Sequence, residues 1–177
     1  KARRFADSSG QRWTISHDAS GRVTAVFDPR GGYSAYDYSG TKLARFTDPT
    51  GRRTTFVHGG SGNLIGVTFP DGASVSMIYD GSHRMLRYAD RDGQPTLYGY
   101  DVCGWANRIT PPGLGTTTFS YLDWGLTRVT DPSGARTTVM HNVMRNVAGV
   151  VDPLGRRSTY TWEGNRLQWF VDGSNRR

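Results

Sequence analysis

A four-residue turn sequence returns at a fixed interval along the chain, and this period constrains the fold more than any other feature. Asp-Pro-x-Gly occurs four times, and four variants of it fill the gaps between those copies. The spacing between successive turn glycines is always 20 or 21 residues. These glycines are Gly10, Gly31, Gly51, Gly72, Gly93, Gly113, Gly134 and Gly155. An internal period of this length is typical of a repeat architecture with one small structural unit per repeat.

The chemistry of the turn explains why it recurs. In Asp48-Pro49-Thr50-Gly51, proline presets φ for a type I turn and glycine accepts a positive φ. The aspartate side chain can accept a hydrogen bond from the backbone two residues further on. The recurring aspartates are therefore interpreted as turn formers, and so are Asp71 and Asp92, which each precede a glycine.

A second position of the period carries an aromatic residue or histidine before another turn. Glycine or asparagine follows within a few residues each time, so each unit is interpreted as turn, strand, turn, strand. The residues assigned to this position are His17, Tyr36, His58, Tyr79, Tyr100, Tyr121, His141 and Trp162.

The segments between the turns alternate as β-strands do. In residues 74–79, Val75, Met77 and Tyr79 fall on one face, and the two serines and Ile78 fall on the other. Two strands of roughly six residues and two short turns account for the whole unit. We predict an all-β fold of tandem β-hairpins with almost no helix, paired into a curved or spiralling antiparallel sheet.

Composition narrows the function classes only a little. The net charge of +7 permits anionic partners, but the arginines are scattered along the chain, so no specific nucleic-acid site is expected. The single cysteine, Cys103, excludes an intramolecular disulfide and leaves too few thiols for a structural zinc site. No apolar run approaches the roughly 20 residues that span a bilayer.

The repeating unit resembles a known family. Thr96–Gly104 (TLYGYDVCG) and Thr118–Gly125 (TFSYLDWG) are similar to the tyrosine-aspartate repeat, also called the RHS repeat, and the resemblance covers about eight repeats. Such repeats occur in bacterial Rhs and wall-associated polymorphic toxins, in the BC component of insecticidal toxin complexes, and in animal teneurins. The resemblance implies hairpins wound into a hollow β-shell, which encloses a toxic C-terminal domain in bacteria and is an extracellular scaffold in teneurins.

The expected function follows from this resemblance. Residues 1–177 are expected to be a single repeat region within a larger secreted or cell-surface protein, a shell segment that encloses or presents a toxin or other effector. Expected partners are further repeats of the parent chain, the enclosed domain and secretion machinery. The alternative is an extracellular carbohydrate- or cell-wall-binding adhesion module that uses Tyr, Trp and Arg side chains. The third hypothesis is a hydrolase that uses scattered Asp and His residues.

No catalytic, cofactor-binding or metal-ligating residue is predicted. Three histidines occupy the aromatic position, where each substitutes for tyrosine, and His83 is interpreted as a solvated turn residue. No motif places a nucleophile, a base and an orienting group together. Cys103 lies in a turn before Gly104 and is expected to be an exposed thiol without a catalytic role.

Two segments imitate functional motifs. The self-cleavage motif of bacterial shells is similar to Asp-Pro-x-Gly-Leu, but Asp152–Arg156 has Arg156 where that motif has leucine, so the protease activity is not carried over. The glycine-rich segment Gly59–Gly66 resembles a phosphate-binding loop, which requires a following helix that is not predicted here. It is interpreted as a repeat turn with extra glycine.

Overall fold

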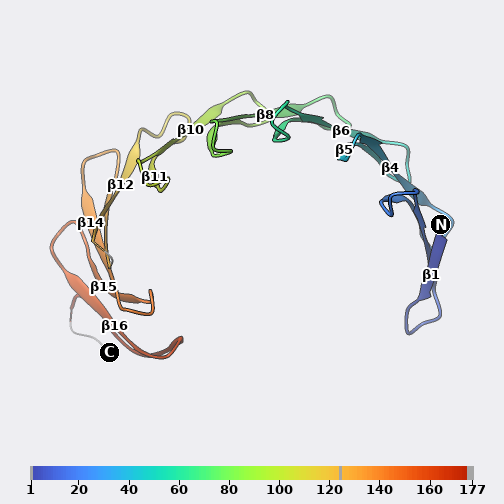
Figure 1. Cartoon of the computed structure of the whole chain (residues 1–177). Coiled ribbons are helices and arrows are strands. Elements are labelled where there is room, and N and C mark those ends of the chain that lie inside the picture. Colours follow the sequence, from blue (N-terminus) through green and yellow to red (C-terminus); the bar gives the residue numbers. More distant parts are fainter. Residues whose placement is uncertain (1, 124, 175–177) are drawn as a thin grey trace. The chain divides into compact units, whose positions relative to one another are not determined.

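A computed structural model describes residues 2–123 and 125–174 of the chain. These residues form seventeen β-strands that pair antiparallel, and they contain no helix (Figure 1). The prediction of an all-β hairpin-repeat fold is therefore confirmed. The chain divides into two compact units, Lys1–Pro95 and Thr96–Arg177.

Each unit is a series of short strands. The first unit contains β1 (Ala2–Ala6), β2 (Arg12–His17), β3 (Val23–Phe27), β4 (Tyr33–Ser39), β5 (Lys42–Thr47), β6 (Arg53–His58), β7 (Leu64–Thr68), β8 (Ser74–Tyr79) and β9 (Met85–Ala89). The second contains β10 (Pro95–Tyr100), β11 (Ala106–Thr110), β12 (Thr117–Asp123), β13 (Leu126–Thr130), β14 (Arg136–His141), β15 (Val147–Val151), β16 (Arg157–Glu163) and β17 (Arg166–Val171), with the first residue of β10 at the boundary.

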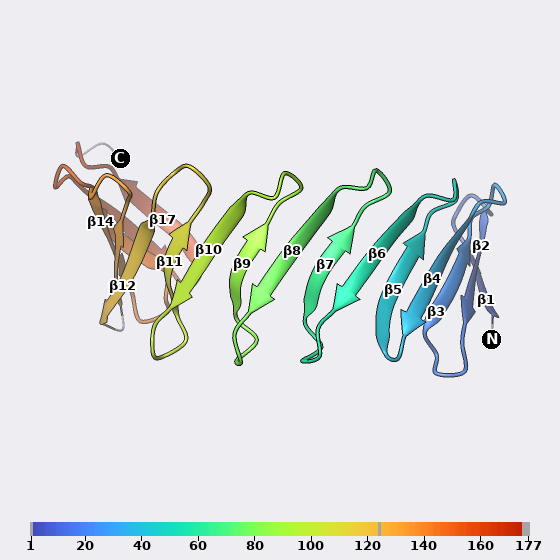
Figure 2. The ribbon, with the colours of Figure 1, turned by 90° about the horizontal axis from the view of Figure 1, so that it is seen from above.

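Within each unit, every strand pairs antiparallel with the next strand in the chain (Figure 2). Each repeat is a hairpin of an even-numbered strand and the odd-numbered strand that follows it. Successive hairpins then pair edge to edge, as in β7 and β8, where Gly66 lies opposite Ser76 and Thr68 opposite Ser74.

The Asp-Pro-x-Gly sequence closes a three-residue turn. The Asp48 N–H donates to the Arg52 carbonyl at 2.9 Å, and the Gly51 N–H donates to the Asp48 carbonyl at 2.9 Å. Gly51 has φ of 82°, the left-handed conformation that glycine adopts without steric cost. This is a type I turn completed by a left-handed residue, a common closure for a three-residue hairpin loop.

The same turn also closes most hairpins at the other end of the strands, which the sequence analysis did not recognise. Asp18, Asp80, Asp101 and Asn142 each open such a turn. In two of these turns the left-handed position is not glycine. His83 occupies it with φ of 62° and Arg145 with φ of 65°.

One of the turn assignments from the sequence needs correction, and one turn has a different geometry from the rest. Gly113 was grouped with the eight equivalent turn glycines, but the segment between β11 and β12 is longer than a three-residue turn and holds a second left-handed glycine, Gly115. Gly40 follows a different rule, because Ser39 pairs directly with Lys42 across a two-residue turn. The period is therefore conserved more strictly than the turn geometry.

The hairpins carry a β-bulge that the sequence did not reveal. In β4 and β5, Asp37 pairs with Arg45 and Tyr38 with Leu43, so Ala44 has no partner across the hairpin. A bulge at this place recurs in six other hairpins, and in β12 and β13 the unpaired residue lies on the first strand instead. Bulges of this kind bend a strand and increase its twist.

The bulge also shows that one aromatic assignment was wrong by two residues. His58 and Tyr79 directly follow the register shift in their hairpins, and in β4 the residue at that place is Tyr38. Tyr36, assigned to this position from its following aspartate, instead pairs with Phe46, with ring centroids 5.2 Å apart. The tyrosine that precedes aspartate is therefore not a reliable marker of the register.

The buried core cluster lies on one face of the first unit. Along β8, the side chains of Val75 and Met77 are buried while Ser76 and Ile78 are exposed, as the alternation predicted. We call this side of each unit the apolar face. A cross-strand pair of apolar or aromatic residues lies near the middle of each hairpin on this face, and these pairs are Ile15/Val26, Tyr36/Phe46, Phe56/Val67, Met77/Tyr88, Tyr98/Ile109, Phe119/Val129, Val139/Val150 and Tyr160/Phe170.

Each unit is a single layer of strands without a second layer packed on it (Figures 1 and 2). Val67, Val75, Met77 and Ala89 are the buried hydrophobic residues of the described chain. The accessible surface is 12268 Å² for 19.6 kDa, whereas a compact protein of this mass exposes about 8,600 Å². Three of these residues cover one another on the apolar face, whereas Ala89 pairs with Ser76 on the opposite face, so burial is limited on both faces.

The one-sided core predicts different costs for neighbouring truncations in β8. Met77 is 9% exposed and packs in the core cluster, whereas Ile78 is 50% exposed on the opposite face. Met77→Ala should lower the free energy of unfolding by about 2 kcal/mol, because it leaves a cavity among packed side chains. Ile78→Ala should cost less than about 1 kcal/mol. Urea denaturation of both variants measures the difference, and equal losses would contradict a one-sided core.

Candidate functional site

The turn carboxylates are occupied by their own turns. The Asp48 Oδ1 accepts hydrogen bonds from the N–H groups of Thr50 and Arg52, at 2.9 and 3.0 Å, and from the Thr50 hydroxyl at 2.7 Å. Its Oδ2 accepts from the Arg52 Nε at 2.7 Å. The hydrogen bond from the Thr50 hydroxyl is the largest of several that hold the pKa of Asp48 well below its usual range. This geometry confirms the interpretation of the aspartate as a turn former.

An arginine four residues later reinforces the same carboxylate in four turns. These pairs are Asp18–Arg22, Asp48–Arg52, Asp80–Arg84 and Asp152–Arg156, with contacts of 2.6–2.7 Å. In Asp18 and Asp80 the backbone N–H of the arginine contributes most to a lowered pKa. The Asp152–Arg156 pair belongs to this series, so the segment that imitates a cleavage motif has the geometry of an ordinary repeat turn.

The four histidines lie in different hairpins or turns of the chain. His17, His58 and His141 end the first strands of three different hairpins, in the position that tyrosine or tryptophan fills elsewhere. His83 is exposed in its turn, and its Nδ1 lies 2.9 Å from the Asn63 Oδ1. Each therefore lies where the repeat period placed it.

No group of three or more His, Cys, Asp or Glu residues in the described part of the chain is arranged to hold a metal ion. The described residues also include no helix of the length and apolarity needed to cross a bilayer.

Aromatic residues at the end of the first strand connect neighbouring hairpins. The Tyr38 hydroxyl donates to the Val23 carbonyl at 2.9 Å, and the Tyr121 hydroxyl donates to the Ala106 carbonyl at 2.8 Å. The Trp162 Nε1–H donates to the Val147 carbonyl at 2.6 Å. In each case the acceptor is the first residue of the last strand of the preceding hairpin. The polar end of the aromatic side chain therefore connects one repeat to the previous one by a hydrogen bond.

A second set of contacts joins hairpins through the residue that ends the turn. The Arg22 guanidinium donates to the Gly40 carbonyl and lies over the Tyr38 ring, 4.5 Å from its centroid. The Asn146 Nδ2 donates to the Gly164 carbonyl at 2.8 Å. Arg22 and Asn146 occupy equivalent turn positions, so the same kind of contact forms at two places in the repeat series.

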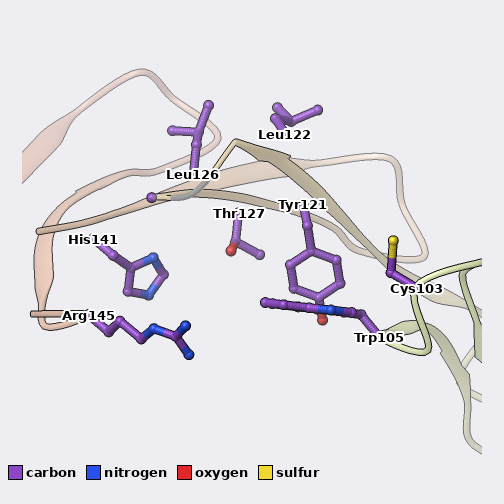
Figure 3. A pocket seen from close by; sticks show the side chains of 9 residues that line it. Cys103, Trp105, Tyr121, Leu122, Leu126, Thr127, His141 and Arg145 are labelled. Carbon is purple, nitrogen blue, oxygen red and sulfur yellow. The ribbon is translucent and has the colours of Figure 1, made fainter. Parts of the chain in front are cut away.

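The second unit contains a pocket of about 660 Å³, and the Tyr121 ring lines it (Figure 3). Trp105 and Tyr121 form one wall, with ring centroids 4.8 Å apart at an interplanar angle of 61°. His141 and Arg145 form the opposite wall, and the Thr127 hydroxyl points between the two walls. The pocket therefore has one aromatic side and one side of nitrogen donors.

Gly125 closes the pocket near its backbone. The His141 N–H donates to the Gly125 carbonyl at 2.6 Å, and a Cβ at position 125 would meet the His141 carbonyl oxygen at 2.8 Å. Only glycine allows this approach without a shift of the backbone. Cys103 also lines the pocket and is exposed in its turn, as predicted, with its side chain directed away from the two walls.

Sequence reasoning missed this pocket. His141 was interpreted as a substitute in an aromatic series, and neither Trp105 nor Arg145 was singled out. A signal was present, because Trp105 stands where other turns carry arginine and Arg145 where other turns carry glycine. The convergence of these residues depends on the register of three hairpins and needs the structure.

Comparison with known proteins gives one family and a set of related folds. Residues 36–75 match the sequence model of the RHS repeat. No curated protein sequence matches the chain significantly.

Three solved structures have a similar fold. A crystal structure of TcdB2-TccC3 without its hypervariable C-terminal region has a TM-score of 0.71 at 13% identity, over 93% of this chain and 12% of that chain. TcdB2-TccC3 itself has a TM-score of 0.70 at 11% identity, over 98% of this chain and 13% of that one. A Tc holotoxin pore from Photorhabdus luminescens with mutated TccC3 has a TM-score of 0.53 at 13% identity, over 93% of this chain and 9% of that chain. The chain thus spans about an eighth of the first two.

The turn carboxylates predict a loss of stability in acid. The pKa values of Asp7, Asp18, Asp48, Asp131 and others are lowered in the folded chain. A carboxylate whose pKa is lowered by folding stabilises the fold fully above its unfolded pKa of about 4, and that contribution is lost as the pH falls through the folded pKa. The urea concentration at the unfolding midpoint should therefore decrease as the pH is lowered from about 5 to about 2.

Asp48→Asn isolates the contribution of one turn. Asparagine keeps the Oδ1 acceptor, as Asn142 does in its own turn, where it accepts from the N–H groups of Met144 and Asn146. The variant should weaken the acid dependence of the urea midpoint because it removes the charge paired with Arg52. Asp92→Asn is the matched control for charge at an exposed position. An acid dependence unchanged by Asp48→Asn would contradict the role of the carboxylate.

Proposed function

We propose that this chain, which carries RHS repeats, is a wall segment of a larger hollow shell that encloses or presents another polypeptide. In this proposal residues 1–177 are one continuous repeat region of a longer secreted or cell-surface protein. The wall contacts further repeats of the parent chain and the enclosed toxin or effector. The observation that carries the proposal is the single layer of hairpins, with both faces accessible and few side chains buried.

A wall explains why the chain can be stable with so little burial. An isolated hairpin is marginal in water, and a single-layer sheet gains stability only as hairpins are added side by side. In the described chain, hydrogen-bonded turns join successive strands, and Tyr38, Tyr121 and Trp162 each connect their hairpin to the preceding one. Such a sheet can separate two spaces, and the area that it covers determines how well it does so.

The repeat match and the fold similarity support this proposal at different levels. The match to the RHS repeat covers residues 36–75, and the same hairpin recurs before and after them. The similar folds belong to parts of Tc toxin proteins. The enclosure of an effector and the contact with secretion machinery are inferred from this relationship and are part of the proposal.

The proposal can be tested with a photo-crosslinker placed on either face of the same strand. Tyr79 and Ile78 are neighbours in β8 and point to opposite faces. In the full parent protein, p-benzoyl-phenylalanine at one of these two positions should crosslink to the enclosed polypeptide, because a wall has one inner face. The other position should give no such crosslink and is the matched control. Crosslinks from both faces, or from neither, would refute the wall.

A further inference from the structure

Three departures from the repeat converge on the pocket in the second unit. Trp105 ends its turn where Arg22 and Arg52 end theirs, and Arg145 takes a left-handed turn position otherwise held mostly by glycine. A non-glycine residue with positive φ is strained, and such strain persists where the surrounding structure holds it in place. The hairpin geometry that the repeats share does not require tryptophan or arginine at these two positions.

The third departure is in the backbone. In the other hairpins the residue left out of the pairing lies on the second strand, as Ala44 does in β5 and Gln168 in β17. In β12 and β13 it lies on the first strand, where Leu122 is passed over between Tyr121 and Asp123. Leu122 lines the pocket. Bulges that re-aim side chains are found next to binding sites more often than elsewhere.

The two walls of the pocket are chemically complementary. The Trp105 and Tyr121 rings offer apolar faces on one side, and Trp105 is 53% exposed. Figure 3 shows the Arg145 guanidinium and the His141 ring directed into the space on the other side. Among the side chains that the structure describes, no carboxylate pairs with Arg145. Its donors are therefore available to a ligand.

We propose that this pocket binds a sugar ring that carries a carboxylate, such as a uronic acid residue of a glycan. The ring lies against Trp105 and Tyr121, whose apolar faces match the C–H face of a pyranose. The Arg145 guanidinium binds the carboxylate through two parallel hydrogen bonds, for which its planar fork is suited. His141 and the Thr127 hydroxyl bind ring hydroxyls. The volume of about 660 Å³ lies within the range of small-molecule sites.

This assignment favours an acidic sugar over two other ligands. A neutral sugar would leave the guanidinium without its preferred acceptor, and a simple anion would make no use of the aromatic wall. The pocket is distinct from the wall function in its use of Trp105, Arg145 and the Leu122 bulge, which the hairpin repeat does not need, although Tyr121 also joins its hairpin to the preceding one.

Isothermal titration calorimetry with two matched oligosaccharides tests the proposal. One ends in glucuronic acid and the other in glucose, with the rest identical. The unmodified chain should bind the acidic sugar about tenfold more tightly than the neutral one, as expected for one charge-assisted contact. Failure to bind the acidic sugar, or equal binding of both, overturns the proposal.

Two variants restore residues that the repeat uses elsewhere, so they keep the fold. Arg145→Gly removes the guanidinium and relieves the strain of φ 65°. It should be at least as stable in urea and should lose the tenfold preference for the acidic sugar. Trp105→Arg places in this turn the residue found in four others and should weaken the binding of both sugars.

A distant aromatic residue supplies the control. Trp169, 61% exposed on β17, lies outside the pocket, and Trp169→Ala should leave both affinities unchanged. A tenfold preference that survives Arg145→Gly, or an equal loss in Trp169→Ala, would show that binding is not at this pocket.

Discussion

The hydrogen bonding of an aspartate side chain to its own turn sets the rest of the structure. One carboxylate oxygen accepts from two backbone N–H groups, so the three-residue loop has one geometry and the pairing of the flanking strands has one register. Register matters because a slip of one residue exchanges the two faces of a strand. With the register fixed at each of these turns, the apolar pairs of successive hairpins fall on the same face within a unit.

The single layer makes local geometry more important than in a compact domain. A two-layer protein corrects local errors by burying a shared core, but this chain has only a few buried side chains among its described residues. Its stability is closer to a sum over hairpins and the contacts between neighbours. This is why the polar contacts between hairpins, such as Tyr38 to Val23, accompany the apolar pairs in holding the sheet together. A damaged turn should therefore disturb its own repeat and the adjoining ones first.

Most of the fold could be predicted from the sequence because the information is local. The turn chemistry of Asp48–Gly51 and the alternation in residues 74–79 each depend on a few neighbouring residues. The bulge could not be predicted, because it depends on how two strands pair. Tyr36 was misplaced for the same reason, since its following aspartate favoured it over Tyr38 and only the bulge shows which tyrosine holds the position. The pocket required the register of several hairpins at once, although the unusual Arg145 marked one of its walls.

The central claim is that these hairpins form a single-layer wall that has another polypeptide on one side. Electron cryomicroscopy of the full parent protein tests it most directly, because the map resolves both the strands and whatever covers them. The account predicts that residues 2–174 appear as one layer of antiparallel hairpins, with solvent on one face and density of the enclosed polypeptide on the other. A map in which a second layer of secondary structure packs on the apolar face, or in which both faces border solvent, would contradict it.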